Sequence, residues 1–241
     1  MRRWIILLLL CSCAGAAFAQ AAVPCTERAK KWQTLLRDYE FNEMEAWITD
    51  SMKACPMDSY PEIHHQAALT FLWRGKLDQS KPIIEKLTSK ARDSIKASPT
   101  AASFGVTNYL PLLQAVYSGA TPKVEEYLAN YSEAIVKFQE QALIYFLRNN
   151  DPRFADHYSA RRKVKTEYMP LLCKVWCKRN SRVKDCPCSA DPAPRPKAGT
   201  YLFYQDYVDG KPLEEIRKGI ETTYADAPML KKEVLECLGL K

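Results

Sequence analysis

Four cysteines stand close together in the chain, and they constrain its fold more than any other feature. Cys173 and Cys177 are four residues apart, so they share a face if their segment is helical, and Cys186 and Cys188 are two apart, so they share a face if theirs is extended. Two facing pairs predict two disulfides between a helix end and the following loop, closing rings of roughly ten to sixteen residues. The alternatives are a zinc or copper site formed by the same four thiolates, and a thiol-redox centre.

The first residues predict export from the cytoplasm. Two arginines precede an apolar run over residues 4–10, and Ala17-Phe18-Ala19 has the form of a signal-peptidase site. The apolar run is shorter than the roughly 20 residues that span a bilayer. We therefore predict a signal peptide over 1–19 and a periplasmic or secreted mature chain. The alternative is a lipoprotein anchored at Cys13, because the residues before it resemble a lipobox.

Export makes disulfides possible for the remaining cysteines. Cys25 begins one expected helix and Cys55 ends the next, so a short link places the two sulfurs at the same end of a hairpin, and we predict that they are bonded. The seventh cysteine of the mature chain, Cys237, lies in the final turn of the last expected helix. In this scheme it is left free, or it exchanges with one of the four clustered cysteines.

Apolar residues recur at helical spacing along most of the chain, which predicts an all-α fold of stacked antiparallel helical hairpins held by disulfides. Only eight glycines occur in 241 residues, where average usage near 7% gives roughly twice as many, so tight β-turns are scarce. The segment 201–207 is aromatic and fits either an extended piece or a short helix. The expected helices are 24–39, 43–55, 62–74, 77–95, 108–117, 122–130, 133–147, 153–169, 212–224 and 228–238.

One part of this pattern resembles a known repeat. Trp32-x-x-Leu35-x-x-x-Tyr39 is similar to the opening of the tetratricopeptide consensus. Positions used by a following unit are occupied by Ala68, Gly75 and Leu87. The resemblance covers about 70 residues, and it implies stacked helix pairs with a concave surface that holds a peptide or protein segment.

These patterns divide the chain into four parts. After the signal peptide we expect a helical-hairpin repeat domain over 20–170, a basic Cys/Pro-rich loop over 171–198 and a C-terminal helical segment over 199–241. Eleven Lys or Arg residues lie between positions 161 and 197, against three acidic residues, within a chain of net charge +7. Such a region predicts contact with an acidic partner or an anionic envelope surface, and export argues against nucleic acid. Its predicted contact residues are Arg161, Arg162, Lys163, Lys165, Lys174, Lys178, Arg179, Arg182 and Lys184.

Motifs of catalysis are missing from the sequence. It has no Gly-x-Ser-x-Gly elbow, His-Glu-x-x-His helix or Walker loop, and no catalytic residue is predicted. The sequence therefore predicts an exported, non-catalytic binding protein, a scaffold, adaptor or inhibitor that engages another envelope or secreted protein. A cysteine-cluster metal or redox protein is the alternative. A hydrolase with scattered carboxylates is a third hypothesis, which two carboxylates of raised pKa in one pocket would support.

Overall fold

Twelve helices make up the described part of the chain in a computed structural model, and no strand occurs in that part. The structure describes residues 23–97, 109–130, 136–160, 168–181, 185–189, 191–192, 195–196 and 199–240. The helices are α1 (Cys25–Arg37), α2 (Phe41–Ala54), α3 (Pro61–Trp73), α4 (Leu77–Ala97), α5 (Leu110–Tyr117), α6 (Thr121–Asn130), α7 (Val136–Arg148), α8 (Arg153–Ala160), α9 (Met169–Arg179), α10 (Thr200–Asp209), α11 (Leu213–Thr223) and α12 (Pro228–Leu238). The all-helical prediction is confirmed for these residues.

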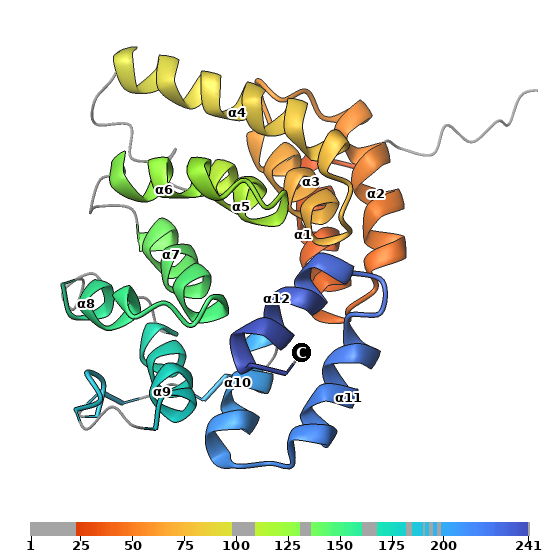
Figure 1. Cartoon of the computed structure of the whole chain (residues 1–241). Coiled ribbons are helices and arrows are strands. Elements are labelled where there is room, and N and C mark those ends of the chain that lie inside the picture. Colours follow the sequence, from red (N-terminus) through yellow and green to blue (C-terminus); the bar gives the residue numbers. More distant parts are fainter. Residues whose placement is uncertain are drawn as a thin grey trace, which may run out of the picture.

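The first four helices pack each on the next, as their apolar stripes predict (Figure 1). Met44 and Ile48 lie one turn apart on α2 and are buried. Ile63 and Ala67 form the same kind of buried pair on α3. Gly75 follows the end of α3 with φ +76°, a left-handed conformation that costs glycine little, and the chain then enters α4.

The chain then curves back on itself (Figure 1). Helices α5 to α9 follow the stack, and α10 to α12 return to lie beside the first helices. Helix α12 packs against α3, α7, α9 and α10, so it joins the early and late parts of the chain. Phe41 meets Tyr224 edge to face at 6.0 Å, and the Gly199 amide donates to the Tyr39 hydroxyl at 2.9 Å. These contacts tie the first hairpin to the C-terminal helices.

Helix α12 has the bounds that the sequence predicts. Pro228 occupies its first turn, where the missing N–H has no cost, and Gly239 follows its end with φ +71°. Leu230, Val234 and Leu238 form its buried stripe at intervals of four.

One predicted segment is corrected, and one that the sequence left open is decided. The expected Cys/Pro-rich loop over 171–198 begins inside a helix, because α9 continues to Arg179. Pro170 lies in the first turn of α9, so this proline starts a helix where we expected one to end. The undecided aromatic segment 201–207 belongs to α10. The predicted signal peptide, with Cys13, and the segment 161–167 lie outside the described residues.

Among the described helices, none is both long and apolar enough to cross a membrane.

Candidate functional site

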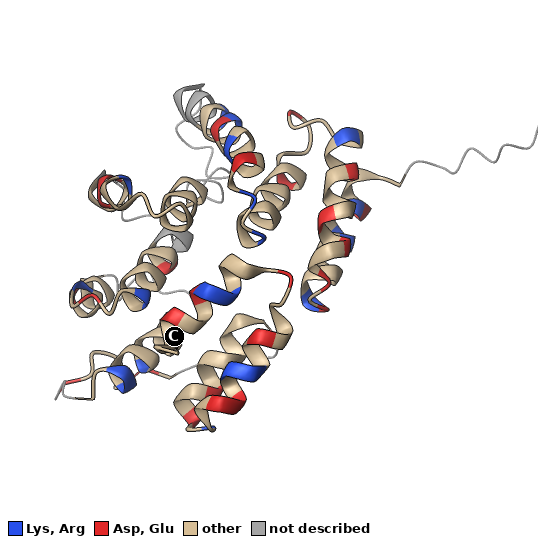
Figure 2. Cartoon of the chain, turned by 45° about the vertical axis from the view of Figure 1, so that its right-hand side comes forward, with Lys and Arg blue, Asp and Glu red and all other residues tan. Residues whose placement is uncertain are grey.

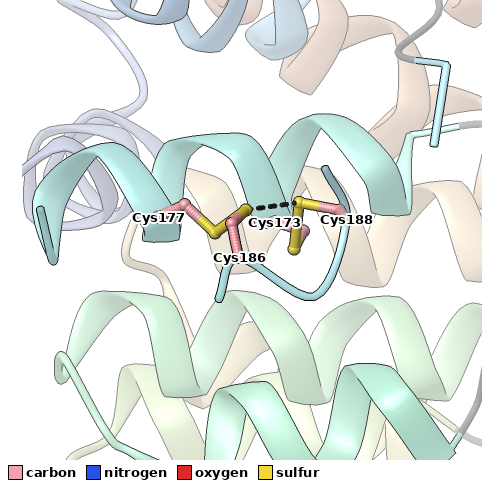
Figure 3. Close-up of side chains that lie close together, drawn as sticks. All are labelled: Cys173, Cys177, Cys186 and Cys188. Carbon is pink, nitrogen blue, oxygen red and sulfur yellow. Dashed lines mark hydrogen bonds between the residues drawn. A yellow bond between two sulfur atoms is a disulfide. The ribbon is translucent and has the colours of Figure 1, made fainter. Parts of the chain in front are cut away.

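The four clustered cysteines form two nested disulfides (Figure 3). Cys173 pairs with Cys188 and Cys177 with Cys186, with Cα–Cα distances of 6.1 and 5.8 Å, which lie in the usual range. The bonds fasten α9 to the loop 185–189, and their sequence separations of 15 and 9 fit the predicted ring sizes. Tyr158 of α8 adds a third tie to this part of the chain, because its hydroxyl donates to Asp191 at 2.7 Å.

The sulfur cluster is compact enough to serve as a metal site after reduction. All four Sγ atoms lie within 4.8 Å of one another, and those of Cys186 and Cys188 are 3.3 Å apart. A metal ion binds thiolates, however, and all four sulfurs are bonded in pairs here. Zinc or copper binding would therefore require both disulfides to be reduced, and in the oxidised arrangement the cluster acts as a staple.

The other cysteines are arranged as the hairpin argument predicts. Cys25 and Cys55 are joined, with Cα atoms 5.9 Å apart, so the start of α1 and the end of α2 lie together. Cys237 is buried and is the free cysteine of the described part of the chain. Burial raises the pKa of its thiol to about 12, so it stays protonated and unreactive at neutral pH.

Two of the predicted basic contact residues serve the fold itself. The Arg179 guanidinium donates to the Leu147 carbonyl at 2.5 Å, at the end of α7. It also donates to the carbonyls of Glu236 and Cys237 at the end of α12, at 3.1 and 2.7 Å. A cation at helix C-termini is favourable because it meets their unpaired carbonyls and the negative end of the helix dipole.

Lys178 makes a similar contact at the end of α10. Its ammonium donates to the carbonyls of Tyr207 and Val208 at 2.5 and 3.3 Å. Lys174 is half-buried on the same helix. The remaining predicted contact residues lie outside the described part of the chain: Arg161, Arg162, Lys163, Lys165, Arg182 and Lys184. Figure 2 shows basic and acidic residues interspersed on the described helices.

A cavity of about 250 Å³ lies between six helices, α1, α3, α5, α7, α10 and α12. Its wall is mostly aromatic and aliphatic, and two glutamates are its charged members. The lining residues are Trp32, Leu36, Leu69, Trp73, Tyr109, Leu113, Tyr117, Glu140, Gln141, Ile144, Thr200, Tyr201, Tyr204, Leu230 and Glu233. A concave apolar site with a few convergent polar groups is the usual form of a small-ligand site.

Glu140 enters the cavity wall from α7. It is only 2% exposed, and its Oε1 atom accepts a hydrogen bond from the Tyr201 hydroxyl. The Tyr201 ring stacks on the Tyr168 ring with their centroids 4.1 Å apart, and this contact fixes the position of the Tyr201 hydroxyl. Tyr109 shares the same side of the site, and its hydroxyl lies 3.1 Å from His65 Nε2. This carboxylate is therefore held in place by neighbours on other helices.

Glu233 enters from α12. It is 5% exposed, and its carboxylate interacts with the Tyr117 hydroxyl. Arg148 is nearby, but its Nε and Nη2 atoms both donate to Glu236, at 2.8 and 2.6 Å. Burial raises the pKa of Glu233, while the positive charge of Arg148 acts in the opposite direction.

Two tyrosines of the wall carry buried hydroxyls. The hydroxyl of Tyr117 interacts with Glu233, and that of Tyr204 interacts with the Cys237 thiol. Burial raises the pKa of both phenols well above their ordinary range, so they stay neutral. A few convergent polar groups of this kind in an apolar wall are typical of a small-ligand site.

No catalytic or binding motif predicted this cavity, but the sequence does hold a signal for it. Glu233 lies three residues after Leu230 and four before Cys237, on the apolar stripe of its helix. Glu140 occupies the same kind of position, three and four residues before Leu143 and Ile144. A carboxylate on a buried helix face is rare unless it has a partner or a function.

No protein-family model, curated protein or solved structure matches this chain.

Proposed function

We propose that this chain is an exported, non-catalytic binding protein that holds its ligand in the central cavity. One observation carries the proposal: the side chains of Glu140, Glu233, Tyr117 and Tyr204 converge on a cavity of about 250 Å³ whose wall is otherwise mostly aromatic and aliphatic. The surrounding helices are fixed by packing and by disulfides, so the cavity wall is held in shape before a ligand enters. Such preorganisation lowers the entropic cost of binding.

Export is part of the same proposal. The signal-like segment supports it, and so do the three disulfides of the described chain, because disulfides persist in oxidising compartments.

The expected partner, another envelope or secreted protein, also belongs to the proposal. Successive packing of α1, α2, α3 and α4 supports a tetratricopeptide-like stack, the kind of scaffold that binds polypeptides. A polypeptide can supply a cavity ligand as a single side chain. In this form of the proposal the predicted basic contact residues bind the same partner, and the cavity is its anchor point.

A plugged cavity tests the binding function. Gln141 is half-buried in the wall on α7, so Gln141→Trp places a bulky side chain at the cavity. The same substitution at exposed Gln79 of α4 is the matched control. We would screen small amines, sugars, amino acids and short peptides by thermal shift. At least one class should raise the melting temperature of wild type and of Gln79→Trp but not of Gln141→Trp; a ligand that stabilises all three equally binds elsewhere, and no ligand at all refutes the proposal.

Catalysis by the two glutamates is a second candidate, which one observation favours. Tyr201 donates a hydrogen bond to Glu140, whereas burial raises the pKa of Glu233. Carboxylates in unequal environments can divide the roles of base and acid. Incubation of the ligands found above, followed by mass spectrometry, decides between the candidates. Product formation that Glu233→Gln abolishes would make the protein an enzyme.

A further inference from the structure

We propose that the four clustered cysteines form a tetrathiolate zinc site when they are reduced, so that one zinc ion replaces the two nested disulfides. The ligands are Cys173 and Cys177 of α9 and Cys186 and Cys188 of the loop 185–189 (Figure 3). This site is independent of the central cavity. It fastens the same two segments that the disulfides join, so the chain is stapled here in either redox state.

The spacing of the four sulfurs is that of a zinc site. Zinc binds four thiolates at about 2.3 Å in a tetrahedron, which places the sulfurs about 3.8 Å from one another. Here all four Sγ atoms lie within 4.8 Å of one another, and those of Cys186 and Cys188, which belong to different disulfides, are 3.3 Å apart. Two sulfurs released from a disulfide must separate by less than about 2 Å to reach the tetrahedral spacing. Rotation about the Cα–Cβ bonds between staggered positions supplies this movement without a change in the backbone.

The backbone that carries the sulfurs is held by contacts that do not depend on the disulfides. Helix α9 packs against α7, α8, α10 and α12. In the loop, the Ser189 amide donates to the Cys186 carbonyl at 3.1 Å, and the Asp191 amide donates to the Cys188 carbonyl at 3.0 Å. Tyr158 of α8 donates to the Asp191 carboxylate at 2.7 Å. Reduction therefore leaves the four thiols close together and ready to bind one ion.

The donor set selects a thiophilic metal. This group of described residues consists of four cysteines, with no histidine or carboxylate among its members. Thiolates are soft ligands that suit zinc, copper(I) and iron–sulfur clusters, whereas calcium and magnesium take oxygen ligands. Four thiolates around one centre fit tetrahedral zinc, and four protein ligands leave no open position on the ion. The site is therefore structural and not catalytic.

Positive charge on α9 favours the thiolate form that zinc requires. Each cysteine of α9 is followed directly by a lysine, Lys174 or Lys178. Cations beside a cysteine stabilise its thiolate, and a zinc ion with four thiolates carries a net negative charge. Asp185 precedes Cys186 and acts in the opposite direction, but it is exposed. The two cations therefore outweigh the one anion next to the ligands.

Zinc binding and disulfide formation start from the same four thiols, because cysteines enter a new chain in the reduced state. Binding of Zn²⁺ forms four zinc–sulfur bonds and releases the thiol protons. Oxidation instead removes two electrons and two protons for each disulfide formed, and a disulfide of an oxidising compartment accepts them by thiol–disulfide exchange. A dithiol reductant reverses that exchange and is itself oxidised to a disulfide. Zinc and the oxidant therefore compete for the cluster.

Metal titration of the reduced protein tests the proposal. The full mature chain is reduced with a phosphine, freed of it without oxygen and titrated with cobalt(II), whose thiolate complexes absorb strongly. We expect one cobalt ion per chain with the absorption of a tetrahedral thiolate complex, and loss of this absorption when zinc displaces cobalt. Absence of the thiolate absorption would overturn the proposal, and so would binding of copper(I) without binding of zinc. Equal zinc binding by reduced and oxidised protein would also overturn it, because the oxidised cluster has no thiolates.

Two matched double variants locate the ion. Cys173→Ser with Cys188→Ser removes two ligands, so zinc affinity should fall by more than the about 10–100-fold that loss of an outer-shell partner costs. Cys25→Ser with Cys55→Ser also removes one disulfide but no ligand, and it should leave zinc affinity unchanged. Equal effects of the two double variants would overturn the proposal.

Thiol protection in the wild-type protein decides the question even where a variant fails to fold. Zinc should slow the alkylation of the four cluster cysteines in the reduced protein and leave that of Cys25 and Cys55 unchanged, as peptide mass spectrometry can show. Zinc should also raise the melting temperature of the reduced protein, because it binds the folded state. The same alkylation rate of the cluster with and without zinc would overturn the proposal.

Discussion

The stapled region and the central cavity differ in how their polar and reactive groups are satisfied. In the stapled region, α9 and the loop 185–189, four cysteines are paired and the cations at the end of α9 bind helix carbonyls. In the cavity, the hydroxyls of Tyr117 and Tyr204 and the Oε2 atom of Glu233 make no hydrogen bond of ordinary geometry among the described residues, and they interact more weakly, Tyr117 with Glu233 and Tyr204 with Cys237. The region with the more conspicuous sequence is thus the more completely satisfied one.

This difference shows where unused chemistry remains in the molecule. Cysteines and basic residues attract attention in a sequence. In the stapled region, however, the cysteines are bonded to one another and the cations bind backbone carbonyls, so neither is left for a ligand. Glutamate and tyrosine are common and inconspicuous, yet in the wall of a cavity their polar atoms are available to a ligand. The stapled region therefore stabilises the fold, and the cavity is the candidate for function. Four experiments can break or sharpen this comparison.

The largest effect is expected from removal of both nested disulfides. Replacing Cys173, Cys177, Cys186 and Cys188 by alanine releases a ring of 15-residue separation and a smaller ring inside it. The outer ring is worth about 3 kcal/mol in the chain-entropy model, and the inner one adds less because the outer bond already restricts it. We expect the free energy of unfolding to fall by about 4 kcal/mol, measured by guanidinium denaturation.

The control for this variant is Cys237→Ala, which removes the buried unpaired thiol and should cost about 1 kcal/mol. The comparison also predicts that the disulfide-free protein, where folded, still binds a cavity ligand. Loss of ligand binding in folded protein would show that staple and cavity are one functional unit.

The second effect concerns the arginine at the end of α9. Arg179→Met removes a cation that donates to three carbonyls at the ends of α7 and α12. Charge-assisted hydrogen bonds of this kind contribute about 1.5–3 kcal/mol, so we expect a loss of about 2–4 kcal/mol in the free energy of unfolding. Lys174→Met, on the same helix, should change it by less than about 0.5 kcal/mol. Equal effects of the two substitutions would mean that Arg179 is not a helix cap in solution.

The sequence predicted those parts of the structure that depend on local spacing. Helical periodicity gave α12 its bounds, and the spacing of Cys173, Cys177, Cys186 and Cys188 gave the two rings, because neighbours in the chain decide both. Pro170 was misread because proline suits the residue after a helix as well as the first turn of one. Only the residues on its C-terminal side, which continue α9, resolve that ambiguity.

The cavity could not be predicted in this way, because distant helices form it. Glu140 and Glu233 meet only because α12 returns to pack against α7. The local sequence does not indicate that α12 packs against α7, because an apolar stripe shows which face of a helix is buried but not which helix covers it. The two glutamates on buried faces were the available signal. Read alone, each is equally consistent with a paired structural carboxylate.

The third experiment applies one substitution to both regions. Tyr158 and Tyr204 are each 1% exposed, but the hydroxyl of Tyr158 donates to Asp191, whereas that of Tyr204 interacts only with the weakly polar thiol of Cys237 among the described residues. Tyr158→Phe should cost about 1–2 kcal/mol of unfolding free energy because it removes a buried hydrogen bond to the Asp191 carboxylate. Tyr204→Phe should be neutral or stabilise by up to about 1 kcal/mol. A loss of similar size in both variants would show that Tyr204 is satisfied in solution, and the contrast between the regions would disappear.

The smallest effect is a change in the pH dependence of stability, and Glu233→Gln should reveal it. Burial raises the pKa of Glu233 in the folded protein above its ordinary value of 4.5. As pH rises through 4.5, the unfolded chain loses this proton first and the folded chain retains it, so the unfolded state binds fewer protons and stability falls. The loss of stability ends above the folded-state pKa of Glu233. The glutamine variant has no titrating group at this position and therefore shows no such loss. We therefore expect Glu233→Gln to gain stability relative to wild type between about pH 4 and pH 7.

Unfolding midpoints at the two pH values measure this gain, and Glu221→Gln supplies the control, because it removes an exposed carboxylate of the neighbouring helix α11. The control should differ from wild type equally at both pH values. If the stability of the wild type instead rises with pH relative to that of Glu233→Gln, Arg148 holds the Glu233 carboxylate ionised. Glu233 would then belong to a structural ion network with Arg148 and Glu236, as satisfied as the stapled region, and Glu140 alone would supply the charge of the cavity.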